Sequence, residues 1–210
     1  MEDVSVSVER VFHHIQQLPR CCKRTLIAIG GPPASGKSTL AGQLQMRLVE
    51  EGYPCGLVPM DGFHLDNKIL VARGLLSRKG APETFDVEGF AALIRRLGSE
   101  NELSIPLFDR GRDCVIEDAG HINAQHQHII IEGNYLFLND GVWQDLHSFW
   151  RLGVFISPPQ KILEQRLIKR WRDNGLDDAC AKARAMSNDI PNGKLTVSKI
   201  NRQAIDIWFD

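Results

Sequence analysis

Residues 31–38 read GPPASGKS, which matches the pattern G-x-x-x-x-G-K-[ST] in full. The apolar run TLIAIGG (25–31) before it is typical of a short buried strand, and Leu40, Leu44 and Leu48 after it have helical spacing. Between a strand and a helix, the backbone N–H groups of such a glycine-rich loop point inward and bind phosphate oxygens, aided by the helix N-terminus. The sequence therefore predicts a P-loop and a nucleotide site.

The P-loop pattern assigns separate roles to its side chains. Lys37 is expected to reach the β- and γ-phosphates of the nucleotide, and the hydroxyl of Ser38 is expected to ligate Mg²⁺. Seven residues make up the predicted nucleotide-binding set: Gly31, Ala34, Ser35, Gly36, Lys37, Ser38 and Thr39.

Strand-like and helix-like segments alternate along the chain. This order predicts an α/β fold with a parallel, doubly wound sheet, in one domain over residues 1–210. The expected strands are 25–31, 54–60, 105–108 (a strand or an extended edge), 128–132, 151–157 and 204–209. The expected helices are 5–18, 37–51, 85–98, one that ends near residue 171, and 177–186. Residues 173–203 are the least regular part and are expected to form a flap plus a connection.

Composition limits the class of partner and the compartment. Lys plus Arg number 25 against 26 Asp plus Glu, so no overall field favours nucleic acid or a membrane surface. Five cysteines without a CxxC pair fit reduced thiols, and no signal peptide or apolar run of membrane-spanning length is present. We expect a cytoplasmic protein that acts on a small molecule, and a homodimer is left open.

The carboxylate of Asp61 stands directly after the apolar run GLVPM (56–60), at the end of a predicted strand. The carboxyl ends of parallel strands face one side of a sheet, where ligands bind, so Asp61 is expected in the same crevice as the P-loop. A carboxylate beside a γ-phosphate is unfavourable unless it binds Mg²⁺ or takes a proton from an attacking hydroxyl. Asp61 is therefore predicted to be a catalytic base or a metal ligand, and the alternative is an Asp-Gly turn.

P-loop proteins include GTPase switches, ATPase motors and phosphotransferases, so the motif alone does not name the reaction. The guanine-reading NKxD is absent, because Asn67-Lys68 is followed by Ile69-Leu70, and no LSGGQ-like signature of transporter ATPases is present. The DxxG shape of DVEG (86–89) is better explained by Asp86 as the cap of a helix. A small-molecule kinase is the leading interpretation, and a nucleotide-binding regulator without transferase activity is the alternative.

The stretch DGFHLDNKILVARGLLSRKGAPETFD (61–86) resembles pantothenate kinase in its DGF, RGL and KGxPExxD elements, and IIIEGNYL (129–136) extends the match. The chain is thus similar to the P-loop kinases grouped as phosphoribulokinase, uridine kinase and bacterial-type pantothenate kinase. It also resembles bacterial proteins labelled nucleoside/nucleotide kinase or "putative fructose-transport-system kinase". The resemblance implies a five-stranded parallel sheet with a helical lid, ATP with Mg²⁺, and transfer to a hydroxyl. It implies that Asp61 is the general base and that Glu132 lies near the metal.

The sequence departs from these kinases where the acceptor is expected to bind. Pantothenate and uridine kinases carry a His shortly after the proline that Pro106 matches, whereas PLFDRGRD (106–113) has none. It offers Arg110 and Arg112, which suit an anionic acceptor such as a sugar phosphate, or else a solvated turn. His64, three residues beyond Asp61, is a further candidate substrate contact.

The basic segment KILEQRLIKRWRD (161–173) places Arg166 and Arg170 four residues apart on one helix face. In the related kinases this region begins a lid that closes over ATP. Fixed cations there stabilise the charge on the transferring phosphoryl oxygens, so Arg166 and Arg170 are candidate catalytic residues of a lid at about 166–190. Arg172 is a further candidate, and a solvated basic face is the alternative.

Overall fold

Five parallel strands form the central sheet of the computed structural model, which describes residues 4–19 and 23–210. Their order is β2-β5-β1-β6-β7, and each neighbouring pair is parallel. This confirms the predicted five-stranded parallel sheet. The strands are β1 (Thr25–Gly30), β2 (Cys55–Pro59), β5 (His128–Gly133), β6 (Leu152–Ile156) and β7 (Ile207–Phe209).

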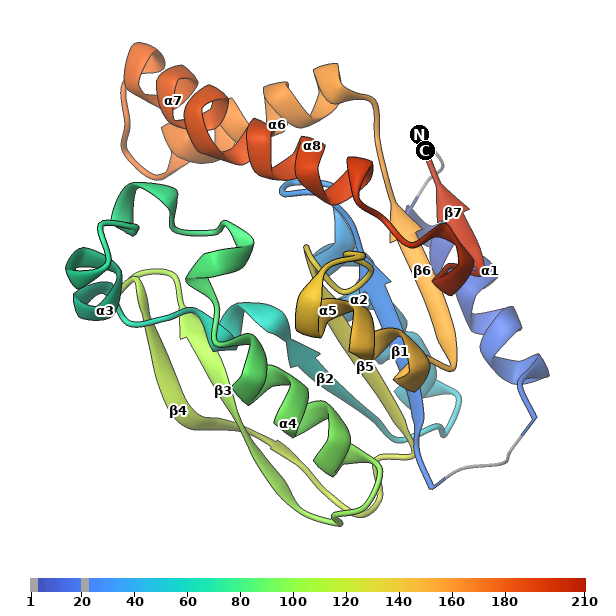
Figure 1. Cartoon of the computed structure of the whole chain (residues 1–210). Coiled ribbons are helices and arrows are strands. Elements are labelled where there is room, and N and C mark those ends of the chain that lie inside the picture. Colours follow the sequence, from blue (N-terminus) through green and yellow to red (C-terminus); the bar gives the residue numbers. More distant parts are fainter. Residues whose placement is uncertain (1–3, 20–22) are drawn as a thin grey trace.

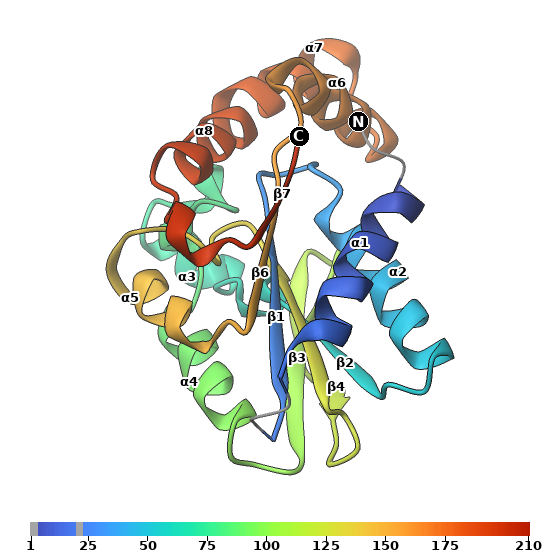
Figure 2. The same cartoon turned by 90° about the vertical axis from the view of Figure 1, so that its right-hand side faces the viewer.

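Helices cover both faces of the sheet. Figure 2 shows α1 (Val4–Gln17) and α2 (Lys37–Glu50) on one side, and α4 (Val87–Leu97) with α5 (Gly141–Asp145) on the other. The predicted stripe of Leu40, Leu44 and Leu48 is almost completely buried in the hydrophobic core on the α1–α2 side. Burying each such side chain stabilises the fold by about 1.5–3 kcal/mol, and this holds α2 and the loop before it against the sheet.

A separate helical layer lies over the carboxyl ends of the strands (Figure 1). It comprises α6 (Gln160–Asp173), α7 (Asp178–Arg184), a π-helical turn (Ala185–Asp189) and α8 (Ile190–Ser198). The predicted flap at 173–203 is therefore mostly helical, and the layer extends beyond the predicted lid at both ends. The helices expected to end near residue 171 and at 177–186 correspond to α6 and α7, whereas α8 was not predicted. The layer buries a small cluster of its own, with Leu163, Leu167 and Ile190.

An antiparallel hairpin stands beside the main sheet. It consists of β3 (Leu103–Asp109) and β4 (Cys114–Ile122), with a register irregularity between Ile105 and Leu107. The extended segment predicted at 105–108 is confirmed and is longer than expected, whereas β4 was not predicted. Most of the β4 residues are only half-buried or exposed, so they lack the apolar pattern of a buried strand.

The remaining elements are short connections. They are α3 (Asn67–Ala72) and 3-10 turns at Met60–Phe63, Leu76–Arg78, Pro82–Thr84, Leu146–Phe149 and Arg202–Ala204. The predicted cap of α4 is confirmed, because the carboxylate of Asp86 accepts a hydrogen bond from the amide of Gly89 at 3.0 Å. Cys21 and Cys22 lie outside the described residues. Within those residues, every helix is too short or too polar to span a membrane.

Candidate active site

The sheet brings three predicted site segments to one edge. Glu132 is in register with Ile29 of β1 on one side and with Pro59 of β2 on the other. The P-loop begins two residues after Ile29, and Asp61 stands two residues after Pro59. Glu132 therefore lies between the phosphate loop and Asp61, although these residues are far apart in the sequence.

The P-loop has the backbone shape of an anion cradle. Ala34 and Gly36 both have left-handed backbone conformations, with φ of 62° and 103°. Alternation between right- and left-handed residues turns successive N–H groups toward one point, which is the geometry that binds phosphate. Gly36 adopts this conformation without cost, whereas Ala34 is strained in it. The hydroxyl of Ser35 is buried there without a hydrogen-bond partner among the described residues.

Lys37 and Glu132 form the buried polar floor of the site. Their exposed fractions are 9% and 6%, and Oγ of Ser38 donates to Oε2 of Glu132 at 3.1 Å. Burial lowers the pKa of Lys37 and raises the pKa of Glu132, while the attraction between the two opposes both shifts. The hydroxyl and carboxylate oxygens are of the type that Mg²⁺ prefers, so these residues fit the expected metal.

Asp61 lies in the 3-10 turn after β2, held against the hairpin. A Cβ atom added to Gly62 would overlap the backbone carbonyl oxygen of Pro106, so only glycine allows this approach. From the same hairpin, Nη2 of Arg110 donates to Oδ2 of Asp61 at 2.6 Å. Burial opposes ionisation of Asp61, but the surrounding cationic groups outweigh it and lower its pKa. Those groups include Lys37, Arg110 and Arg170, together with His64 when its ring is protonated, so the carboxylate is charged and able to accept a proton.

A cavity of about 510 Å³ joins these groups under the helical layer. Eleven of the predicted site residues line it: Ala34, Ser35, Gly36, Lys37, Ser38, Thr39, Asp61, His64, Arg110, Arg166 and Arg170. Gly31 lies at the start of the P-loop, where a Cβ atom would crowd Oγ of Ser35. This volume is within the range of small-molecule sites.

His64 is fixed beside Asp61 in the cavity. Its Nδ1 lies 2.8 Å from the carbonyl oxygen of Asp61, and its ring packs between those of Phe85 and Phe108. The ring centroids are 4.1 and 4.7 Å away, respectively. Burial lowers the pKa of His64, which favours the neutral ring. It remains a predicted substrate contact.

The lid arginines meet the site in different ways. Nη1 of Arg166 donates to the carbonyl oxygens of Ala34 and Ser35, both at 3.1 Å, so α6 is attached directly to the P-loop. Arg170 also lines the cavity, although its side chain is more exposed than that of Arg166, and desolvation followed by repulsion from Arg110 lowers its pKa. Its charge acts on Asp61, while Arg166 contacts the backbone of the cradle.

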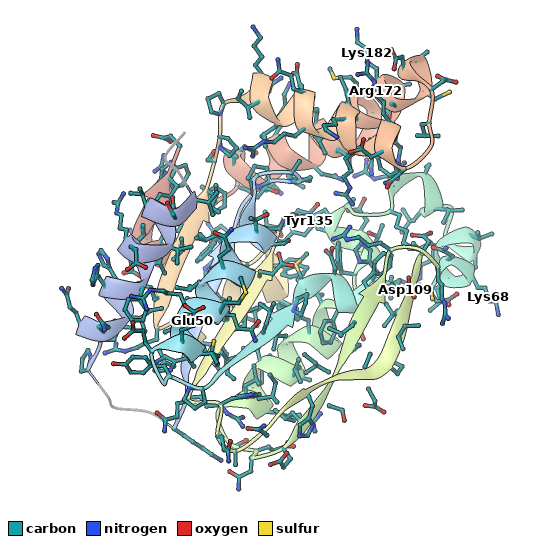
Figure 3. All side chains as sticks on the ribbon, turned by 180° about the vertical axis from the view of Figure 1, so that it is seen from behind. Glu50, Lys68, Asp109, Tyr135, Arg172 and Lys182 are labelled. Atoms are coloured by element: carbon teal, nitrogen blue, oxygen red, sulfur yellow. The ribbon has the colours of Figure 1, made fainter. Side chains whose placement is uncertain are left out.

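Two other predicted arginines lie away from the cavity lining. Arg112 contacts Asp109 at 3.5 Å with 75% of its side chain exposed, as expected for the solvated-turn alternative. Arg172 pairs with Asp178 at 2.6 Å within the helical layer. Figure 3 shows Asp109 on the hairpin and Arg172 among the lid helices, well separated.

Sequence reasoning missed a second group of cavity residues. Nζ of Lys79 donates to Oδ1 of Asn67 at 2.8 Å and to Oδ1 of Asp113 at 2.9 Å, tying the 77–80 segment to the hairpin. The carbonyl oxygen of Lys79 accepts a hydrogen bond from the lid residue Asn188 at 2.9 Å. Lys79 belongs to the KGAPE stretch that resembles pantothenate kinase, and its place in that motif could have identified it as a site residue.

Asn134 and Tyr135, which follow β5, add polar groups near the cavity. Oδ1 of Asn134 is buried at the cavity without a partner in the part of the chain that the structure describes. The hydroxyl of Tyr135 donates to the carbonyl oxygen of Gly80 at 2.6 Å, and Figure 3 shows Tyr135 between the sheet and the lid layer. The position of Asn134 just past a strand end was the signal that could have identified it.

Comparison with known proteins identifies the family. A crystal structure titled "putative fructose transport system kinase", from Silicibacter sp. TM1040, superimposes with a TM-score of 0.91 and 40% identity, covering 100% of both chains. A Schizosaccharomyces pombe protein named "Putative uridine kinase C227.14" is 30% identical over 98% of this chain and 90% of its own length. The chain belongs to the P-loop kinases.

Other relatives include "Uncharacterized protein YggC" from Escherichia coli, which is 38% identical over 81% of this chain and 71% of its own length. No family model matches the chain. The relatives extend to pantothenate kinases and, by fold, to phosphoribulokinase, as the resemblance in the sequence implied.

Proposed function

We propose that this protein transfers the γ-phosphoryl group of ATP, bound with Mg²⁺, to a hydroxyl group of a small molecule. The observation that carries the proposal is the placement of Asp61. Its carboxylate shares one cavity with the P-loop and with Lys37, and it is charged in that position. The kinase relatives support the same reaction class.

The chemistry assigns one role to each side of the cavity. On the P-loop side, Lys37 and the backbone amides hold the phosphates, and Ser38 and Glu132 would hold Mg²⁺, which neutralises phosphate charge when bound. On the other side, Asp61 accepts the proton of the acceptor hydroxyl. The freed oxygen bonds to the γ-phosphorus as the bond to the β-phosphate oxygen breaks, and ADP leaves.

The lid provides the remaining positive charge. In the transition state, charge spreads over the phosphoryl oxygens, and fixed cations stabilise it more than mobile water does. Arg170 is partly desolvated in the cavity and suits this role, whereas Arg166 would hold the loop that binds the phosphates. The cavity of about 510 Å³ beneath the lid layer is of a size that suits small-molecule ligands.

A screen with γ-labelled ATP tests the proposal. Pantothenate, nucleosides, sugars and sugar phosphates are incubated with the enzyme, and labelled products are separated from ATP. We expect at least one acceptor to be labelled by the wild type, with Asp61→Asn as the inactive control. A protein that binds ATP but labels none of them would instead fit the nucleotide-binding regulator.

A further inference from the structure

The acceptor side of the cavity is formed mainly by the hairpin and the 77–80 segment. Phe108, Arg110 and Asp113 come from the hairpin, and Lys79 comes from the segment after α3. Arg110 contacts Asp61 directly, and all of these residues line the same cavity as Asp61 and the P-loop. Their chemistry therefore selects what can present a hydroxyl to this carboxylate.

Most cations of the cavity are matched by local partners. Lys79 is paired with Asp113 at 2.9 Å, Arg166 donates to P-loop carbonyl oxygens, and Arg184 donates to the carbonyl oxygen of Ser77 at 2.7 Å. The positive charge of Lys37 is attracted by the nearby carboxylate of Glu132. None of these groups requires a charged acceptor.

Arg110 differs because its guanidinium is only partly used. Across residues 4–19 and 23–210, its one side-chain hydrogen bond is from Nη2 to Asp61, and 58% of the side chain is exposed. A guanidinium carries five N–H donors in a planar fork that matches a carboxylate or phosphate. The other donors are thus available at the cavity while the contact with Asp61 is kept.

A second cation lies close enough to interact with Arg110. Repulsion from Arg110, after burial, lowers the pKa of Arg170. Two like charges in one cavity oppose each other unless anions lie between or beside them. The transferring phosphoryl group would offset the charge of Arg170. Asp61 engages only one donor of Arg110, so the remaining donors of this guanidinium are left for the acceptor.

We propose that the acceptor carries an anionic group, a carboxylate or a phosphate, which Arg110 binds beside the hydroxyl that Asp61 deprotonates. This rests on the proposed kinase function and names its substrate class. The anion and the hydroxyl lie near each other in the acceptor, because Arg110 and Asp61 are only 2.6 Å apart. A compact hydroxy acid or sugar phosphate meets this requirement, whereas a neutral nucleoside does not.

Matched acceptors on one carbon skeleton test the class. Glycerol, glycerate and glycerol phosphate form one neutral–carboxylate–phosphate series, and glucose, gluconate and glucose phosphate form another. Binding is measured by calorimetry on the protein saturated with Mg²⁺ and a nonhydrolysable ATP analogue, and phosphotransfer is measured with ATP. We expect an anionic member to bind at least about tenfold more tightly than its neutral counterpart. The series also shows whether carboxylate or phosphate is preferred.

Two variants connect this preference to one side chain. Arg110→Ala should weaken binding of the anionic acceptor about 10- to 100-fold, leaving the neutral counterpart and the ATP analogue unaffected. Arg112→Ala is the matched control, since it removes the same charge two residues away, from a side chain that is 75% exposed and does not line the cavity. It should leave the preference intact.

The results separate the two proposals. Neutral acceptors that bind and react as well as anionic ones, in wild type and Arg110→Ala alike, would overturn the inference while the kinase function stands. The inference would also be overturned if no anionic acceptor bound more tightly than its neutral counterpart. A loss of ATP affinity in Arg110→Ala would overturn it as well. Anions that bind through Arg110 without being phosphorylated would instead contradict the proposed reaction.

Discussion

Replacing Asp61 by Asn tests the assignment of the catalytic base. Asn is nearly isosteric and retains the 3-10 turn, but its amide cannot take the proton of the acceptor hydroxyl as a carboxylate does. A positioned base contributes about 10²–10⁴ in rate, equal to about 2.7–5.5 kcal/mol of the barrier. We expect turnover to fall by this factor, while Mg-ATP binds within a few-fold of wild type.

The structure predicts a much smaller change in stability. The contact that Asp61→Asn weakens is the ion pair with Arg110, whose side chains are 21% and 58% exposed. Pairs this exposed contribute about 0.2–1 kcal/mol to the free energy of unfolding. For a chain of 210 residues, that corresponds to a decrease in melting temperature of no more than about 4 °C.

Three measurements on this variant decide between the readings of Asp61. They are turnover with an accepted substrate, ATP affinity by calorimetry, and turnover across a Mg²⁺ titration. If Asp61 chiefly holds the metal, high Mg²⁺ should restore the rate, whereas a missing base is not replaced by metal. A rate close to that of the wild type, with any stability change, would refute the catalytic role and leave Asp61 as a turn residue.

Three further substitutions test other parts of the site. Lys37→Met should lower turnover with ATP at least about 100-fold while the melting temperature stays within a few degrees; near-normal phosphotransfer would contradict its phosphate role. Arg170→Ala should lower turnover about 10²–10³-fold and ATP affinity much less, with Arg172→Ala as the unaffected control; equal losses would make Arg170 a ground-state contact. Gly62→Ala should destabilise the fold by about 1–3 kcal/mol in chemical unfolding, because its Cβ meets backbone at Pro106. Gly42→Ala, with open space at its Cβ, should not, and an equal effect of both would refute the packing argument.

The sequence alone determined the parallel sheet, the phosphate cradle and the position of Asp61 along the chain. These depend on local patterns: a glycine-rich loop between an apolar strand and a helix, and a carboxylate at the next strand end. Because parallel strands end at one edge, such patterns already place Asp61 near the P-loop, and the resemblance to the kinases adds Glu132. The DVEG interpretation was also local, since an N-cap is made within four residues.

Tertiary structure alone decided which side chains meet Asp61. Arg110 and Arg112 are both arginines of one short segment, and the sequence does not distinguish their roles. In the hairpin, Arg110 pairs with Asp61 and Arg112 pairs with Asp109. The hairpin depends on pairing with a half-exposed strand and on the irregularity after Ile105, neither of which has a local sequence signal. The contact of Arg166 with the P-loop likewise exists only because α6 packs over the strand ends, more than 100 residues along the chain.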